Sequence, residues 1–233
     1  LGPLVAPTSI HHPALLANRA ATIDHVSHGR FVLGLGAGWQ INEHNAFGIE
    51  LEEPKARVDR FEEAIQIIRL MLSEQRTTFE GSIYTITDSP CEPKPVQERL
   101  PILVGTGGNR MLRITARHAE EWNTWGHPDG AGERLSAMHA ACEKVGRDPA
   151  TLHTSVQVAV HLSDDSAANA KALEGPLGAR TIAGGADELI GILNQYKELG
   201  FNEFIVPDWL MGSEPAARKE HLDRLHTDVI SQL

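Results

Sequence analysis

Short apolar segments alternate with longer amphipathic segments along most of this 233-residue chain, and that alternation constrains the fold more than any other feature. The apolar runs at residues 31–36 and 101–105 are each followed by a segment with the apolar spacing of a helix, most clearly at 54–72. Parallel strands need a long crossover connection between them, usually a helix. The alternation therefore predicts an α/β fold with a parallel sheet covered by helices.

The number of strands fits an incomplete barrel. A (β/α)8 TIM barrel has eight strands, whereas about six strand–helix units are expected here. The chain begins inside an apolar run without methionine, and an edge strand would leave its backbone groups unpaired. We therefore expect a TIM barrel that forms a single domain over residues 1–233 and lacks its first two units here. The alternative is an open, doubly wound sheet that is complete as written. The expected strands are 1–6, 31–36, 101–105, 121–124, 156–162 and 204–206; the helices are 14–26, 54–72, 110–119, 133–145, 167–173, 186–199 and 214–230; residues 74–100 form an excursion with a hairpin at 79–86.

The composition excludes several classes of protein. A formal net charge of −10 argues against general nucleic-acid binding, which needs a basic face. The apolar runs are much shorter than a membrane span, so we expect no membrane partner. Cys91 and Cys142 lack CxxC spacing, which fits a reducing cytoplasm. The twelve histidines are scattered without the spacing of metal ligands, so no metal site is predicted.

Glycine alternates with other residues where the strand at 31–36 ends, at Gly34, Gly36 and Gly38. Glycine has no Cβ, so a flat ring or a phosphate could lie against this backbone. The spacing differs from the Gly-x-Gly-x-x-Gly turn of a dinucleotide-binding fold. A tight strand-to-loop turn would also explain it. An amide such as Asn42 both donates and accepts hydrogen bonds, as a ring edge or a ribityl hydroxyl requires. The expected cofactor-binding residues here are Gly36, Ala37, Gly38, Asn42 and Glu43.

A second glycine-rich turn follows the strand at 101–105 and precedes a helix. Successive glycine N–H groups beside a helix N-terminus form an anion site from backbone dipoles alone. In a barrel such a turn is the expected place for a cofactor phosphate. The simpler alternative is a helix entry with Asn109 as its N-cap. The expected phosphate-binding residues are Gly105, Thr106, Gly107, Gly108 and Asn109.

Several motifs along the chain resemble the luciferase-like monooxygenase superfamily, and within it the F420-dependent oxidoreductases of the luciferase-like class. The match runs from end to end and starts at the third strand of the family. The motifs are Gly29-Arg30, the Gly-x-Gly-x-Gly-Trp that ends at Trp39, Asn42-Glu43, His12-Pro13 with the Ala-Thr-Ile-Asp that ends at Asp24, Phe47-Gly48, Arg57 with Glu63, the segments 93–97 and 101–108, and His118-Ala-Glu-Glu-Trp-Asn.

The resemblance implies a TIM barrel that binds FMN or the deazaflavin coenzyme F420 at the carboxyl ends of its strands, usually as a homodimer. Leu4 and Val5 align where F420-dependent relatives bulge against the deazaflavin ring, often through a non-prolyl cis peptide bond. The two residues equally suit an ordinary buried strand. Trp39 aligns where relatives can carry an acidic catalytic residue. We expect Trp39 to stack in the pocket or to pack in the core.

The resemblance therefore predicts an oxidoreductase that transfers hydride between F420 and an unidentified small organic substrate. One alternative is an FMN-dependent monooxygenase that uses reduced flavin and oxygen, and another is a flavin- or F420-binding protein without turnover. Such cofactors carry the difficult chemistry, so the protein needs to add only a proton donor. The candidate donors are His11, His12 and His44, although most histidines in such positions cap a helix or pack.

Other charged and aromatic residues are expected to have structural roles. Asp24 and Arg30 are interpreted as a buried pair that holds a helix-to-strand turn. Arg57 and Glu63, on the long helix, are expected to be structural or to lie at a subunit interface. Glu120, Trp122 and Asn123 stand at a strand end and could line the pocket, although Trp122 is more typical of a core residue.

Overall fold

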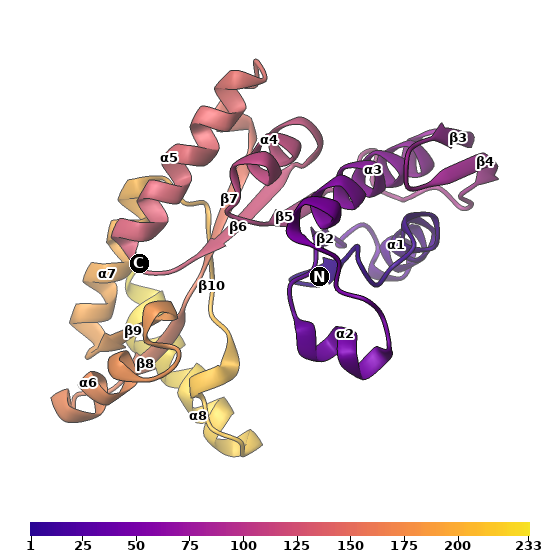
Figure 1. Ribbon diagram of the computed structural model, residues 1–233. Helices are drawn as coiled ribbons and strands as arrows, with labels where there is room; N and C mark the ends of the chain where they lie inside the picture. Colours follow the sequence, from indigo (N-terminus) through magenta and orange to yellow (C-terminus); the bar gives the residue numbers. More distant parts are fainter. The chain divides into compact units, whose positions relative to one another are not determined.

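The computed structural model describes all 233 residues, and the chain divides into two compact units (Figure 1). Unit 1 comprises Leu1–Trp122 and Ala141–Leu152, and unit 2 comprises Asn123–Ala140 and His153–Leu233. The single domain expected over residues 1–233 stays a prediction. None of the helices combines the length and the apolar character that a membrane span requires.

A parallel sheet forms the centre of unit 1. Its strands lie in the order β1-β2-β5, with Leu35 beside both Ala6 and Val104 and with Leu33 beside Ile102. Short apolar strands of this kind are typical of a sheet covered on both faces. The elements of unit 1 are β1 (Ala6–Pro7), α1 (Pro13–Ser27), β2 (Leu33–Gly36), α2 (Ile41–Phe47), α3 (Pro54–Ser73), β3 (Arg76–Glu80), β4 (Thr85–Pro90), β5 (Ile102–Gly105), α4 (Asn109–His118) and the 3-10 turn η1 (Pro149–Thr151).

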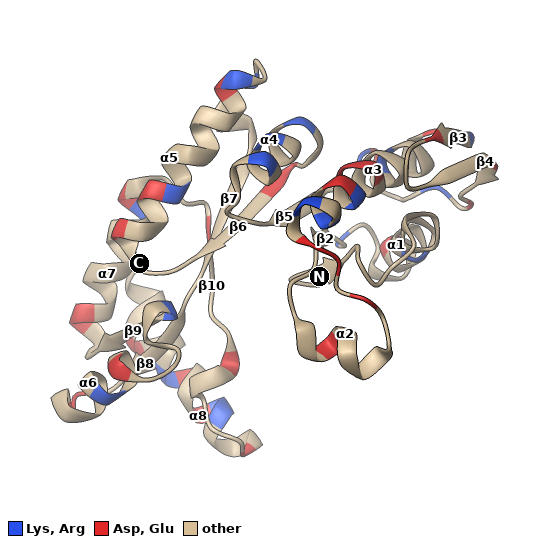
Figure 2. Ribbon diagram, in the orientation of Figure 1, with Lys and Arg blue, Asp and Glu red and all other residues tan.

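Helices α1, α3 and α4 bury their apolar faces in one core with β2 and β5. That core includes Ala17 of α1, Leu35 of β2, Ile65 of α3, Val104 of β5 and Ile114 of α4. Helix α3 has the apolar spacing expected from the sequence, and its charged residues occupy the remaining positions (Figure 2). The predicted helices at 14–26, 54–72 and 110–119 are therefore confirmed to within one residue at each end.

The expected excursion is an antiparallel hairpin of β3 and β4. Glu63 of α3 supports its turn, because its carboxylate accepts hydrogen bonds from the backbone N–H groups of Ser82, Ile83 and Tyr84 at 2.8 to 3.0 Å. A Cβ at Gly81 would come within 2.3 Å of the same carboxylate. The structural role expected for Glu63 is therefore confirmed, and the hairpin is attached to the core through α3.

Unit 2 has its own core, where β8, β9, α7 and the C-terminal helical segment meet. Val160, Ile182, Leu193 and Val229 are among its buried residues. Strands β7 and β10 pair in parallel, and so do β8 and β9. The elements are β6 (Glu121–Trp125) and α5 (Pro128–Lys144), which both cross the unit boundary, and β7 (His153–Gln157), β8 (Ala159–Leu162), α6 (Ser166–Glu174), η2 (Gly178–Arg180), β9 (Thr181–Gly184), α7 (Ala186–Leu199), β10 (Glu203–Ile205), η3 (Asp208–Leu210), α8 (Pro215–Arg224), the π-helix η4 (Leu225–Val229) and η5 (Ile230–Gln232).

Several predicted strand boundaries are wrong. The strand expected at 1–6 is reduced to Ala6–Pro7. The residues before it include Pro3, which has no backbone N–H to donate to a ladder. The strand expected at 156–162 is two strands, since β7 pairs with β10 whereas β8 pairs with β9. Strand β9 was not predicted, because its four residues contain only one large apolar side chain.

Two helix predictions also change. Helix α2 lies where a loop was expected, since its seven residues bury only His44 and carry no continuous apolar stripe. Gly48, with φ at 66°, ends it in the left-handed conformation. The helix expected at 214–230 ends at Arg224 and continues as a π-helical turn.

The predicted pair of Asp24 and Arg30 is wrong. Asp24 is buried, but its carboxylate accepts hydrogen bonds from the backbone N–H and the side-chain amide of Gln97 at 3.0 and 2.7 Å. Arg30 donates instead to the Ser27 carbonyl at 2.8 Å. The buried carboxylate therefore joins α1 to the segment that leads into β5. A sequence separation of 73 residues gives no local pattern for such a contact.

Candidate functional site

The predicted cofactor residues lie in unit 1, around the carboxyl ends of three neighbouring parallel strands. The chain leaves β1 at Pro7, β2 at Gly36 and β5 at Gly105. Because these strands pair in register, their exits lie at one edge of the sheet. Binding and catalytic residues in β/α folds are characteristically carried by the loops at this edge.

The Val5 side chain occupies the space that the glycines of β2 and β5 leave open. A Cβ at Gly36 would lie 2.7 Å from Val5 Cγ2, and a Cβ at Gly34 or Gly105 would lie 3.3 Å from Val5 Cγ1. At Gly34 the Pro3 carbonyl oxygen is closer still, at 1.9 Å. The peptide bond between Leu4 and Val5 is cis, as the resemblance implied. The glycines at the end of β2 are thus required by the chain itself, whatever else lies against them.

The loop after β2 is fixed by contacts with Thr8 and Ser9, which carry no sequence motif, and with Arg57 of α3. Thr8 donates its backbone N–H to the Gly36 carbonyl at 2.8 Å. The Arg57 guanidinium of α3 donates to the Gly38 carbonyl, which confirms a structural role for Arg57. A Cβ at Gly38, where φ is 88°, would come within 2.1 Å of the Ser9 hydroxyl. Only long-range pairing reveals Thr8 and Ser9, because their local sequence carries no motif.

His44 is part of this support and not of an exposed loop. Its ring is buried, and each nitrogen has a partner: Nδ1 lies 2.9 Å from the Gln40 carbonyl, and Nε2 lies 2.9 Å from Ser9 Oγ. A carbonyl only accepts, so Nδ1 carries a proton and donates it to Gln40, while Nε2 is paired with the Ser9 hydroxyl. This arrangement ties α2 to the loop after β1, and it leaves no free nitrogen on His44 for a substrate.

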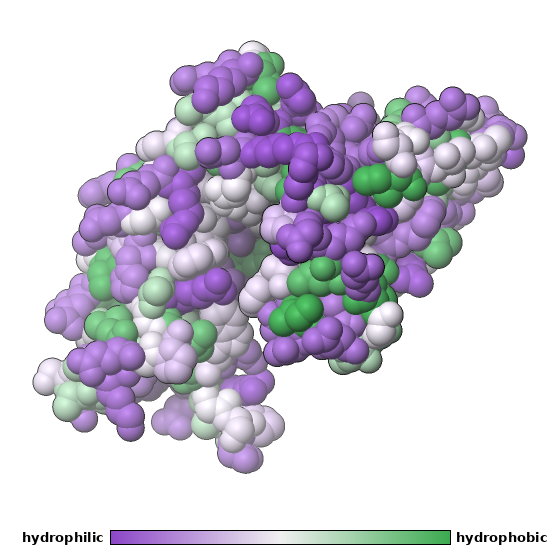
Figure 3. Space-filling view, viewed as in Figure 1, coloured by the Kyte–Doolittle hydropathy of each residue, from purple (hydrophilic) through white to green (hydrophobic).

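The first turn of α2 presents the other predicted residues to solvent. Asn42 and Glu43 are exposed, and Ala37 packs against the core of unit 1. Trp39 is 73% exposed, so the expectation that it packs in the core is wrong. Ile41 and Phe47 are exposed as well, so the three side chains contribute apolar surface around α2. Figure 3 shows green, hydrophobic atoms in the region of α2.

The turn after β5 differs from the turn after β2, because its glycines face open space. A Cβ built at Gly107 or Gly108 would meet no atom within 4 Å. Both residues are exposed. The base of the turn is fixed, since the buried Trp122 donates its indole N–H to the Thr106 carbonyl at 2.9 Å. The core role expected for Trp122 is therefore confirmed, and the turn stands on a rigid base with its glycines uncovered.

Helix α4 begins directly after these glycines. Its N-cap is Gly108 and not Asn109, which is the first helical residue, and no side chain caps the helix. The first backbone N–H with a helical partner belongs to Leu112. The N–H groups of the first turn are therefore available as donors at the positive end of the helix dipole. This open cradle fits a phosphate group.

The remaining histidines differ in their surroundings. His11 is half-buried on the loop after β1, and burial, followed by the charge of Arg19, lowers the pKa of its imidazole below the usual 6.5. It is therefore neutral at pH 7. His12 is exposed and directly precedes α1, and its ring packs edge-to-face on the Tyr84 ring with 5.4 Å between the ring centroids. Among the three candidates, His11 alone combines partial burial with the absence of a hydrogen-bonded partner in the chain.

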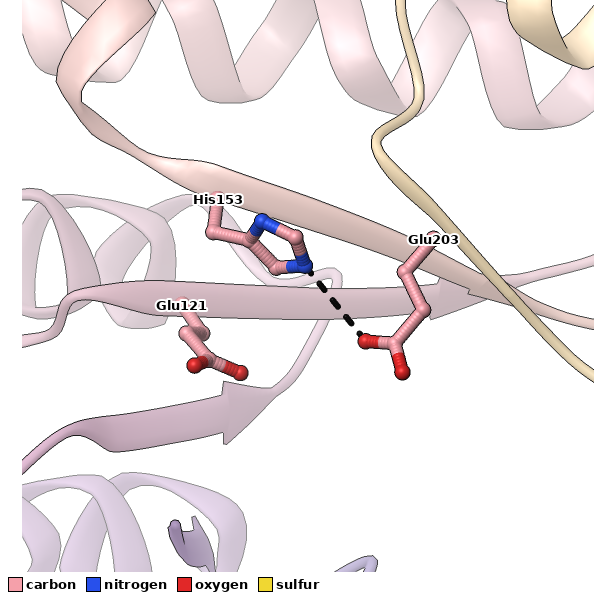
Figure 4. Close-up of side chains that lie close together, drawn as sticks. All are labelled: Glu121, His153 and Glu203. Atoms are coloured by element: carbon pink, nitrogen blue, oxygen red, sulfur yellow. Dashed lines mark ion pairs between the residues drawn. The ribbon is translucent and has the colours of Figure 1, made fainter. Parts of the chain in front are cut away.

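A histidine–carboxylate pair in unit 2 lies on neighbouring parallel strands. His153 of β7 and Glu203 of β10 form an ion pair with 3.4 Å between Nε2 and Oε2 (Figure 4). Their side chains are 43% and 50% exposed. Exposed pairs of this kind are common on protein surfaces and contribute little stability. We assign no function to this pair.

Comparisons with known proteins relate the chain to one family. The family model described as luciferase-like monooxygenase matches residues 1–185. The F420-dependent glucose-6-phosphate dehydrogenase of Microbacterium testaceum is 32% identical over 165 residues, which cover 70% of this chain and 48% of that protein. The F420-dependent hydroxymycolic acid dehydrogenase of Mycobacterium tuberculosis is 29% identical, with 91% of this chain and 58% of that protein covered. The chain thus spans about half the length of these curated relatives.

Among solved structures, the coenzyme F420-dependent tetrahydromethanopterin reductase of Methanopyrus kandleri matches with a TM-score of 0.83. The match covers 100% of this chain and 82% of the reductase, at 16% sequence identity. At this identity the likeness concerns the fold alone. The predicted α/β fold with a parallel sheet is confirmed, and it is the fold of luciferase-like TIM-barrel enzymes.

Substitution of the two kinds of glycine by alanine should change the stability of the fold differently. We expect Gly36→Ala to lower the free energy of unfolding by about 1 to 3 kcal/mol, because the new methyl group would overlap with Val5. We expect Gly107→Ala to leave this free energy unchanged or to raise it by less than about 1 kcal/mol, because the methyl group enters open space. Denaturant unfolding measures both. Equal losses in the two variants would contradict the distinction.

Proposed function

Because the chain belongs to the luciferase-like monooxygenase family, we propose that it is an oxidoreductase that transfers hydride between coenzyme F420 and a small organic substrate. The observation that carries the proposal is the uncovered glycine turn at the N-terminus of α4. A turn of this kind suits the phosphate of such a coenzyme. The names of the two curated relatives, which are both F420-dependent dehydrogenases, favour F420 over FMN.

In this proposal, backbone groups of unit 1 hold the coenzyme. The N–H groups of Gly107, Gly108 and Asn109 would donate to its phosphate, with Gly105 and Thr106 forming the base of the turn. Leu4 and Val5 would border its ring at the edge of the sheet, together with Gly36, Ala37 and Gly38. Asn42 and Glu43 are exposed on α2 and would reach polar groups of the coenzyme.

The residues of the chain would orient the reactants and would accept or donate one proton. The bound deazaflavin would supply a carbon that accepts or donates hydride. Oxidation of an alcohol also releases a proton, and a neutral imidazole is a suitable acceptor for it. His11 is our candidate, because its imidazole is half-buried, is neutral at pH 7 and has no hydrogen-bonded partner in the chain. His12 stays a weaker candidate, and both ring nitrogens of His44 are already engaged.

Two alternatives share the same phosphate site. An FMN-dependent monooxygenase is favoured by the description of the family model, and the turn would suit the phosphate of FMN as well. A coenzyme-binding protein without turnover would need the turn but no proton acceptor. Trp39, which stands where relatives can carry an acid, is compatible with this reading.

A small-molecule substrate, a homodimer and a cytoplasmic location complete the proposal. Cys91 and Cys142 are buried and unpaired, as is usual for proteins of a reducing compartment. The exposed apolar residues around α2 would be available to a second copy of the chain. The substrate stays unidentified.

Titration of the protein with F420 and with FMN tests the choice of coenzyme. We expect F420 to bind at least tenfold more tightly than FMN. We expect Gly107→Ala to weaken F420 binding about tenfold or more, because its methyl group would enter the space proposed for the phosphate, although the fold tolerates it. Fluorescence or calorimetric titration measures both affinities.

The matched control is Gly191→Ala in α7, where a Cβ also meets no atom within 4 Å and no coenzyme contact is proposed. It should bind F420 as the parent does. Preference for FMN would replace the F420 proposal with the monooxygenase alternative. Binding of neither coenzyme would contradict the proposed function altogether.

The pH dependence of alcohol oxidation tests His11. A base must be unprotonated, so we expect the rate to fall as the pH decreases through a pKa below 6.5. His11→Asn should remove this dependence and lower kcat about a hundredfold. Steady-state rates between pH 5 and pH 8 at saturating coenzyme measure it. His12→Asn serves as the control and should keep the parental profile, and an unchanged profile in His11→Asn would exclude His11 as the proton acceptor.

A further inference from the structure

Arginines gather at the end of β5 that lies opposite the glycine turn. A surface cavity of about 460 Å³ in unit 1 is lined by Arg99, Arg117, Arg147 and Glu120, with Ala116, Ala119 and Val145 as its apolar wall. Glu120 precedes β6, and it accepts a hydrogen bond from the N–H of Ile102, the first residue of β5. The expectation that Glu120 lies at the pocket end of a strand is therefore wrong.

Both oxygens of the single carboxylate in this cavity already have partners within the chain. Glu120 forms ion pairs with Arg69 and with Arg99, whose Nε lies 2.6 Å from Oε1. Burial would raise the pKa of Glu120, but the charge of Arg69 and the hydrogen bonds from Ile102 and Arg99 outweigh it, so the pKa is lowered. Glu120 is therefore ionised at neutral pH and balances only one of the surrounding positive charges.

The three arginines of the cavity and the neighbouring Arg69 differ in how many of their N–H donors already have a partner. Arg69 donates to the carbonyls of Leu100 and His118 as well as to Glu120, and Arg147 donates through Nε and both Nη groups to carbonyls and a hydroxyl of the chain. Arg99 uses only Nε, and Arg117 has no partner. The residues that line the cavity carry three positive charges, on Arg99, Arg117 and Arg147, and one negative charge, on Glu120, so the surplus is two positive charges. The Nη groups of Arg99 and the guanidinium of Arg117 have no hydrogen-bonded partner in the chain.

This surplus is unusual for a chain with a net charge of −10. Figure 2 shows blue segments on α4, and Figure 3 shows hydrophilic atoms over the same helix. The pKa of His118, at the end of α4, is lowered by burial and then by the charges of Arg69, Arg117 and Arg99, which is consistent with a positive local field. Guanidinium groups with free N–H donors match the oxygens of a phosphate.

We propose that this cavity binds a small phosphomonoester, with its phosphate on Arg99 and Arg117 and its organic part against Ala116, Ala119 and Val145. The volume exceeds what a phosphate ion needs and lies in the range of small-molecule sites. The cavity is at the amino end of β5, whereas the glycine turn is at the carboxyl end, so it is a second site. The proposal of this second site does not depend on the proposed function.

Calorimetric titration of the coenzyme-free protein with phenyl phosphate, at constant ionic strength, tests the proposal. We expect Arg117→Gln to weaken the binding at this cavity about tenfold or more, because it removes charge-assisted hydrogen bonds. Arg117 has no partner in the chain, so its loss should not affect folding. The matched control is Arg113→Gln, an exposed arginine on the same helix outside the cavity.

The glycine turn could also bind phenyl phosphate, and Gly107→Ala separates the two sites. The proposal expects binding that persists in Gly107→Ala and in Arg113→Gln but is lost in Arg117→Gln. Binding that is lost in Gly107→Ala and unchanged in Arg117→Gln would assign the ligand to the glycine turn and overturn the proposal. Equal losses in Arg113→Gln and Arg117→Gln would show unspecific charge attraction and would also overturn it.

Discussion

The Val5 side chain, lying against the glycines of β2 and β5, is the contact on which the arrangement of the site depends. Gly34, Gly36 and Gly105 leave the space that Val5 and the Pro3 carbonyl fill. This close approach holds the residue that directly precedes β1 against the two neighbouring strands. The loop after β1 is then fixed by two hydrogen bonds, one from Thr8 to the Gly36 carbonyl and one between Ser9 and His44. Arg57 of α3 fixes the loop after β2 through the Gly38 carbonyl. An ordered strand edge of this kind preorganises a binding site.

Glycine serves two different physical purposes at this edge. After β2 it makes room for other parts of the chain, and a methyl group there would collide with Val5 or Ser9. After β5 it leaves the backbone bare, and a methyl group at Gly107 or Gly108 would collide with nothing in the chain. The first use stabilises the fold and the second leaves a helix N-terminus open to an anion. The arginine cavity at the other end of β5 attracts anions by a different means, through side-chain charge.

The periodic parts of the fold could be predicted from the sequence, and the contacts between distant residues could not. The amphipathic stripe of α3 and the Gly200 that ends α7 predicted those helices closely. Helix α2 could not be predicted, because it buries only His44. Strand β9 could not be predicted either, because it has only one large apolar residue. The glycine turn before α4 was found from its pattern, whereas the role of Val5 against Gly36 was not. Partners such as Gln97 for Asp24, or Ser9 for His44, lie too far apart in sequence for any local pattern.

A double-mutant cycle on Val5 and Gly36 tests the central contact most directly. Val5→Ala removes the methyl group that a Cβ at Gly36 would meet. The double variant should therefore lose less unfolding free energy than the two single variants together, by at least about 1 kcal/mol. The same cycle with Gly34→Ala should show no such rescue, because the Pro3 backbone carbonyl also blocks that position. Additive losses in the Val5 and Gly36 cycle, measured by denaturant unfolding, would contradict the account.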